Sequence, residues 1–290
     1  MDLAFLLAVM AAFLWGFANI FAKLSTTKLG MTRIVSLMVV IQGLTYFGGF
    51  YFWHNNVAID LRYGTVALAA GFIGFFGYIC FLESTVEGQV AIVGTIAAAS
   101  PCFTVIAAMA FLSESLAAPQ LIGVAAIIAG IIALSYERNP NSQYSIPARS
   151  LLFAVLAFVL SGLWSLVAKI AISKLGPGNV FGFYAISAVF APLVYICYRR
   201  IRPAPMKIEN PTGISWVFGA AALAFDVLGA LVLSLALSTG LVSVVAPVGN
   251  AAPVVTVTAA VLLLGEKLNR LQLVALACVI TGVLMIGIIG

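Results

Sequence analysis

Charge is what this sequence has least of. Only 8% of its 290 residues are charged, whereas 63% are hydrophobic. A soluble globular domain carries about 25% charged residues. Because 14 Lys and Arg with 9 Asp and Glu cannot cover a water-exposed surface of this size, we expect a multi-pass membrane protein whose main solvent is the lipid bilayer.

Residues that bind metals or carry catalysis are equally scarce. The sequence has one histidine, His54, and no Walker A, HExxH or GxSxG motif, which argues against an enzyme and against ATP-driven transport by this chain. Its four cysteines lie inside apolar segments without CxxC spacing, as small core residues do. We predict no catalytic residue, no metal and no cofactor. The basic residues sit at the ends of apolar segments, so the net charge of +5 indicates membrane topology and no nucleic-acid partner.

Long apolar runs predict ten transmembrane helices. A bilayer core about 30 Å thick needs about 20 apolar residues per helix, and unpaired backbone groups are not tolerated there. The first run lacks a basic leader and a cleavage site, so it reads as a span. The runs cover 3–24, 32–53, 64–83, 89–112, 119–136, 150–172, 179–198, 213–238, 241–264 and 271–289.

The two parts of the chain repeat one another. Residues 101–132 align without a gap to 253–284, and 13 of these 32 pairs are identical, including Pro, Glu and Gln. We therefore divide the chain into a five-helix repeat at 1–137, a linker at 138–149 and a second repeat at 150–290. Five is an odd number, so the second repeat should enter the membrane inverted, as in many secondary transporters.

The repeated motif resembles that of the EamA-type family of the drug/metabolite transporter superfamily. It consists of a proline, then (S/G)-E-x-L about 13 residues later, then Q-L. The motif residues are Pro101, Ser113-Glu114-Ser115-Leu116 and Gln120-Leu121, then Pro253, Gly265-Glu266-Lys267-Leu268 and Gln272-Leu273. The first copy has serine where glycine is usual. The resemblance implies a ten-helix 5+5 fold around a central cavity and export or exchange of amino acids, amines, nucleotide sugars or drugs.

The basic residues also predict an orientation. Eleven of the 14 Lys and Arg belong to the loops that follow odd-numbered spans, and three belong to the loops that follow even-numbered spans. Since Lys and Arg are enriched in cytoplasmic loops, both termini are predicted to lie outside the cytoplasm. A prokaryotic cytoplasmic (inner) membrane is the expected location.

Asp226 is the strongest candidate for a substrate-binding residue. It lies near the middle of the eighth span, with no other charge within ten residues. An acidic residue at this depth usually faces a cavity or a partner. It can bind a cation or an amine, or accept a proton; the alternative is a structural partner for a lysine or a backbone donor.

The ninth span carries a predicted helix break. Pro247 and Pro253 flank Asn250, and each proline removes a helical hydrogen bond. Broken helices line cavities in many transporters, so Asn250 is a second candidate for substrate binding; a simple kink is the alternative. Pro101 marks the weaker counterpart in the fourth span.

Aromatic residues at mid-span complete the predicted site. Trp15 and Asn19 are four residues apart and share a helix face, and Trp164 lies in the middle of the sixth span. An indole offers a cation-binding face and one N–H donor. Tyr78 in the third span joins this set. Packing is the alternative for each.

Other polar residues near the span ends have structural interpretations. We interpret Glu83 as a solvated loop charge, as we do Glu87, and Lys169 as a residue whose ammonium reaches the membrane interface. Glu114 and Glu266 are expected to cap helix N-termini. Small residues four apart, Ala126/Gly130 and Cys278/Gly282, favour packing between the halves or a homodimer.

Together these features favour a secondary carrier. The leading hypothesis is export or exchange of an amino acid or small amine by alternating access, with proton coupling as an option. An exchanger or importer of sugar- or nucleotide-type metabolites is an alternative. It is weakened because the sequence has no evident pair of Lys or Arg residues deep in the spans. A channel or structural membrane protein is the alternative from another class.

Overall fold

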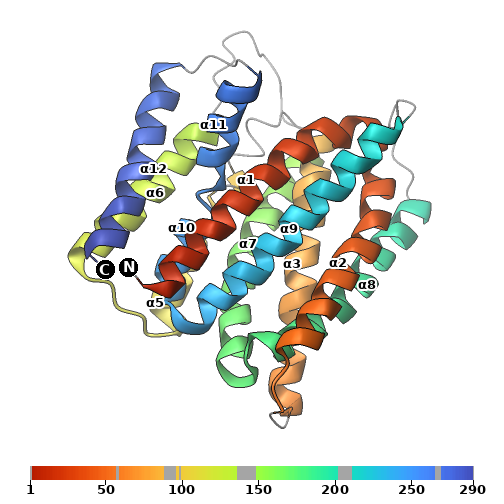
Figure 1. The fold of residues 1–290 in the computed structure, drawn as a ribbon, viewed down its shortest axis with the longest axis horizontal. Helices are drawn as coiled ribbons and strands as arrows, with labels where there is room; N and C mark the ends of the chain where they lie inside the picture. Colours follow the sequence, from red (N-terminus) through yellow and green to blue (C-terminus); the bar gives the residue numbers. More distant parts are fainter. Residues whose placement is uncertain are drawn as a thin grey trace.

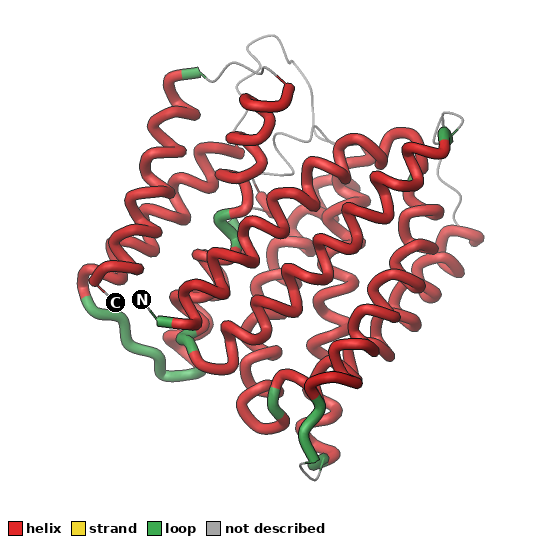
Figure 2. The backbone as a smooth tube through the Cα atoms, in the orientation of Figure 1, coloured by secondary structure: helices red, strands yellow, loops and turns green. Residues whose placement is uncertain are grey.

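The computed structural model describes residues 2–56, 59–87, 96–97, 99–135, 148–201, 211–264 and 269–289. Within this part of the chain all regular structure is helical, as the sequence predicts (Figure 1, Figure 2). The helices of the first half are α1 Leu3–Leu29, α2 Met31–Trp53, α3 Leu61–Glu87, α5 Ser100–Phe111 and α6 Ala118–Ser135. Those of the second half are α7 Ala148–Leu175, α8 Pro177–Ile201, α9 Gly213–Thr239, α10 Val242–Gly249, α11 Ala252–Leu264 and α12 Arg270–Ile289.

The predicted spans correspond to these helices. Eight helical segments are long and apolar enough to cross a membrane, with α10 and the start of α11 forming one of them, and α5 and most of α6 are shorter apolar helices. The first candidate span is Leu3–Ala22, close to the predicted 3–24, and helix α1 continues beyond it to Leu29. The predicted fourth span is described mainly through α5, because residues 88–95 lie outside the described part.

The ninth span is broken where its prolines predict. Helix α10 ends at Gly249 and α11 begins at Ala252. The N–H groups of Asn250 and Ala251 still donate to Ala246 and Val248, so the break is a tight turn between two helices. Pro253 falls in the first turn of α11, where a missing N–H costs no helical hydrogen bond.

Each major helix pair takes one helix from each half. Helix α1 lies along α9, α3 along α7, α2 along α8, and α6 along α12 (Figure 1). The repeat relates the first pair to the second, because it exchanges the first span with the sixth and the third with the eighth. The two halves are therefore similar in packing as well as in sequence.

Small residues allow the closest of these approaches. A Cβ on Gly130 would lie 2.5 Å from Cγ2 of Val279, and one on Gly282 would lie 2.6 Å from the carbonyl oxygen of Gly123. These positions belong to the small-residue faces of the fifth and tenth spans. The structure uses both faces between the halves, and a homodimer stays a prediction.

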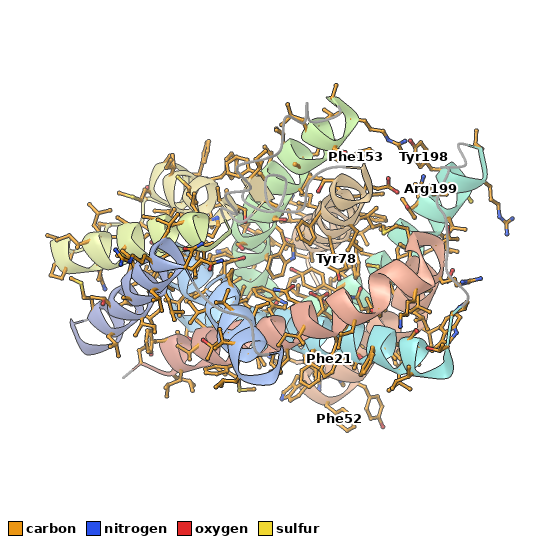
Figure 3. The ribbon with its side chains drawn as sticks, turned by 90° about the horizontal axis from the view of Figure 1, so that it is seen from above. Phe21, Phe52, Tyr78, Phe153, Tyr198 and Arg199 are labelled. Carbon is orange, nitrogen blue, oxygen red and sulfur yellow. The ribbon has the colours of Figure 1, made fainter. Side chains whose placement is uncertain are left out.

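The outer surface is apolar, as a lipid-facing surface must be. Phe52 is 77% exposed and lies at the outer edge of the molecule in Figure 3. Phe47, Leu44 and Phe190 are also exposed on the helices. In water an apolar surface of this kind would promote aggregation, whereas in a bilayer it contacts the hydrocarbon of the lipids.

Candidate functional site

Asp226 occupies the midpoint of α9, with 13 residues on either side within Gly213–Thr239. The residue is partly exposed, and its carboxylate Oδ2 accepts a 2.8 Å hydrogen bond from Nε2 of Gln42. Gln42 lies on α2 of the first half and is 2% exposed. A mid-membrane carboxylate is costly unless partners or water stabilise it. The Gln42 amide supplies one such partner and joins the two halves.

Two tryptophans form an aromatic pair at the backbone of Asp226. The indole Nε1 of Trp15 donates to the backbone oxygen of Asp226 at 3.0 Å. The rings of Trp15 and Trp164 meet edge to face, with centroids 6.5 Å apart. Each indole lies on a glycine of the opposite half, Trp15 on Gly229 and Trp164 on Gly74. A side chain at either glycine would displace an indole, so the glycines position the aromatic pair.

Three tyrosines form a further part of the surroundings. Tyr46 follows Gln42 by one turn of α2 and contacts Tyr184 of α8 edge to face, with centroids 5.4 Å apart. Tyr46 and Tyr78 are both close enough to Asp226 for its charge to act on them. Figure 3 shows Tyr78 in the middle of the helices. The carboxylate is thus flanked by aromatic side chains from both halves.

One polar atom beside Asp226 lacks a hydrogen-bond partner among the described residues. It is Oε1 of Gln42, which is fully enclosed. Buried polar groups are almost always hydrogen-bonded, and leaving one unpaired costs about 1–3 kcal/mol. The Gln42 oxygen is therefore an enclosed acceptor with no described donor, on the same amide that bonds the Asp226 carboxylate.

The structure brings four of the predicted site residues together and places two elsewhere. Trp15, Trp164 and Tyr78 gather around Asp226, as described above. Asn19 instead donates to Oγ1 of Thr256 on α11 at 3.5 Å. Asn250 donates to the carbonyl oxygen of Ala246 within its own broken span at 2.8 Å. These two amides accompany the helix break, and they make no described contact with the carboxylate.

A hollow lies elsewhere, near the chain termini. It is lined by residues of α1, α6, α10 and α12 and the α9–α10 turn, among them Phe5, Gln120, Leu241 and Ile286. Figure 1 shows the N- and C-termini close together at this end. None of the residues around Asp226 lines this hollow, and the central cavity stays a prediction.

The interpretation of Glu83 as a solvated loop charge is wrong. Glu83 is 4% exposed and pairs with Arg199 of α8 at 2.9 Å and with Arg149 of α7 at 3.4 Å. Tyr195 donates its hydroxyl hydrogen to Glu83, and Arg199 Nε donates to the Tyr195 oxygen at 2.8 Å. Figure 3 shows Arg199 near the edge of the helices beside Tyr198. Because Glu83 lies one turn inside the end of α3, two helices of the other half enclose it. The side chain of Glu87 lies outside the described residues.

Two further charges hold the turn between α9 and α10. The Glu114 carboxylate accepts hydrogen bonds from the N–H groups of Val242 and Ser243 at 2.9 and 2.8 Å. It therefore caps α10, as a carboxylate at a helix N-terminus should. Lys169 donates to the carbonyl oxygens of Leu237 and Gly240 at 2.7 and 2.8 Å. Its ammonium thus caps the end of α9, which is also the end of a candidate membrane span, and that it reaches the interface stays a prediction. Glu266 lies outside the described residues.

The match to known proteins covers both halves. The model of the EamA-like transporter family matches residues 2–136 and again 148–288. The chain belongs to this family. The resemblance read from the repeated motif is therefore confirmed, and this EamA-like protein is a membrane transporter by family.

Two relatives show how this EamA-like chain is built. An uncharacterized protein of Methanocaldococcus jannaschii is 28% identical over 137 residues, which cover 47% of this chain and 98% of that protein. That relative corresponds in length to one five-helix half. A solved crystal structure of a protein aligns with a TM-score of 0.74 at 17% identity, over 99% of this chain and 96% of that one. At this identity the likeness shows the fold alone.

The residues that sequence reasoning missed are Gln42, which bonds the carboxylate, and Tyr46 with the adjacent Tyr184. Gln42 is a lone amide in the apolar second span, and Tyr46 follows it four residues later on the same face. This spacing was the available signal. It did not show that the shared face points at Asp226, which lies 184 residues away in the chain.

Proposed function

We propose that this protein is a secondary carrier that exports or exchanges a small organic metabolite, an amino acid or a small amine, by alternating access. Its two halves are inverted repeats that rock around a central cavity. The observation that carries the proposal is the mid-membrane carboxylate of Asp226, contacted by Gln42 and Trp15 of the opposite half. Intramembrane acidic residues of this kind mark substrate or proton pathways.

The arrangement of the halves supports this mechanism. Transporters built from repeats bind substrate near the membrane midplane, where the repeats meet. Asp226 is on α9 and Gln42 on α2, so the hydrogen bond between them crosses that boundary. A substrate that binds between these groups contacts both halves at once. The carboxylate can alternatively hold a proton on the return step, which would couple transport to a proton gradient.

Counterflow in proteoliposomes tests the proposal. Vesicles containing the purified protein are loaded with unlabelled substrate from a panel of amino acids and amines, and uptake of the labelled compound is followed together with internal pH. A carrier shows transient accumulation above equilibrium. Asp226→Asn should abolish it, because the amide keeps the shape and removes the charge.

Asp60→Asn is the matched control, since Asp60 is an exposed loop carboxylate beside Arg62. Substrate flux without counterflow would indicate a channel. Unchanged counterflow in a folded Asp226→Asn variant would remove Asp226 from the mechanism. The predicted non-cytoplasmic termini are tested separately with a C-terminal reporter that is active only in the cytoplasm.

A further inference from the structure

The Gln42 amide is oriented by its partner. Nε2 donates to Oδ2 of Asp226, and a carboxylate can only accept, so the amide nitrogen must face it. The oxygen Oε1 then faces away from Oδ2, enclosed and without a described partner. Because the amide oxygen and nitrogen share one carbon, this acceptor lies next to the group that bonds the carboxylate.

We propose that Asp226 and Gln42 Oε1 together bind the protonated nitrogen of a primary or secondary amine. Such a nitrogen carries one positive charge and at least two N–H donors. One N–H bonds the Asp226 carboxylate and another satisfies Oε1. The inference rests on the proposed carrier function and narrows its substrates from amino acids or small amines to primary and secondary amines. In this assignment Gln42 selects for ligands that carry N–H donors.

The aromatic residues suit the rest of such a ligand. Trp15 and Trp164 present their rings at a 6.5 Å centroid separation, and Tyr78 lies near the same carboxylate. Aromatic faces attract organic cations and cover apolar carbon. The Trp15 N–H is already engaged with the Asp226 backbone, which fixes the orientation of this ring.

Two neighbouring ligand classes fit less well. A quaternary ammonium has no N–H, so it would leave Gln42 Oε1 buried and unpaired. An amino acid brings a carboxylate that Asp226 repels and that needs a cationic partner. Among the described basic side chains, the partly buried Lys169 bonds backbone carbonyls and the buried Arg199 pairs with Glu83.

Ligand binding to the purified full-length protein in detergent tests this assignment without requiring transport. The probes are phenethylammonium, butylammonium, their N,N,N-trimethyl counterparts and phenylalanine, followed by calorimetry and by the rise in melting temperature that binding produces. We expect each primary amine to bind at least about tenfold more tightly than its trimethyl counterpart, the factor that one charge-assisted hydrogen bond supplies. Phenylalanine should bind more weakly than phenethylammonium.

Gln42→Met is the informative variant, because methionine has a similar shape and no polar group. It should lower the affinity for the primary amines about tenfold and leave that for the trimethyl compounds unchanged. If the variant does not fold, the ratio of primary-amine to trimethyl affinity measured with the wild-type protein decides alone.

Three results would overturn the assignment. They are equal affinity for primary and trimethyl compounds, equal affinity for phenylalanine and phenethylammonium, or no binding of either primary amine. If the protein shows counterflow of another solute but binds no amine, the amine assignment is rejected and the proposed carrier function stands. If it binds amines but transports nothing, the proposed carrier function is rejected.

Discussion

Replacing Glu83 alone should destabilise the protein more than removing the whole ion pair. The side chains of Glu83 and Arg199 are 3% and 7% exposed and lie 2.9 Å apart. Removing one partner of a buried pair costs about 3–5 kcal/mol, because the remaining charge stays enclosed. Arg149 lies at 3.4 Å and is 40% exposed, so its contact adds at most about 1 kcal/mol.

In Glu83→Gln the guanidinium of Arg199 keeps its charge and loses its counter-ion. Its nitrogen Nη1 already lacks a described partner in the wild-type protein. Its Nε still donates to the Tyr195 oxygen. In the double variant Glu83→Gln/Arg199→Met no charge is left behind. Replacing a buried pair by uncharged groups of similar volume is often close to neutral, so the double variant should be more stable than Glu83→Gln.

The variants are ranked by their melting temperatures in one detergent. Unfolding is detected as the loss of the monodisperse chromatographic peak on heating. For a chain of this size each kcal/mol shifts the melting temperature by about 2–4 °C, so Glu83→Gln should melt roughly 10 °C below wild type. The double variant should recover most of this difference. A Glu83→Gln protein as stable as wild type, or a double variant less stable than Glu83→Gln, would refute the reasoning.

Two other substitutions test the contacts between the halves. Gly229→Ala would place a Cβ 2.7 Å from the indole of Trp15; we expect a loss of about 1–3 kcal/mol, a lower melting temperature and shifted tryptophan fluorescence, and an unchanged spectrum would contradict the packing. Glu114→Ala removes the α10 cap at Val242 and Ser243; it should cost about 0.5–2 kcal/mol and speed amide hydrogen exchange at these two positions, and unchanged exchange there would show that the cap is dispensable.

The helices and the repeat could be predicted because lipid imposes strong rules on sequence. Apolar length alone indicated the spans, and the repeated Pro and Glu showed that the halves are related. The break between α10 and α11 lies between Pro247 and Pro253, the two residues from which the sequence predicts it. Asp226 was identifiable because a mid-membrane charge is rare and costly.

The partners of these residues could not be predicted in the same way. In a soluble protein the apolar face of a helix identifies its buried side. In a membrane both sides are apolar, so the sequence does not show which face of α2 points inward, and Gln42 was missed. Glu83 reads as a loop charge for a related reason, since its partner Arg199 lies 116 positions further along the chain.

The same property of the membrane explains why polar contacts matter between the halves. Apolar side chains gain little by leaving lipid for a helix interface, so association depends on close packing and on hydrogen bonds. Glu83 with Arg199, Gln42 with Asp226 and Glu114 with the start of α10 each join the first half to the second. A carrier must break such contacts and form others during each cycle. Polar contacts can do this because water or a bound amine can replace either partner, whereas a continuous apolar interface offers no such exchange. The Gln42–Asp226 contact is the one among these three at the middle of the membrane, so a ligand that competes for it acts directly on the contact that holds the halves together there.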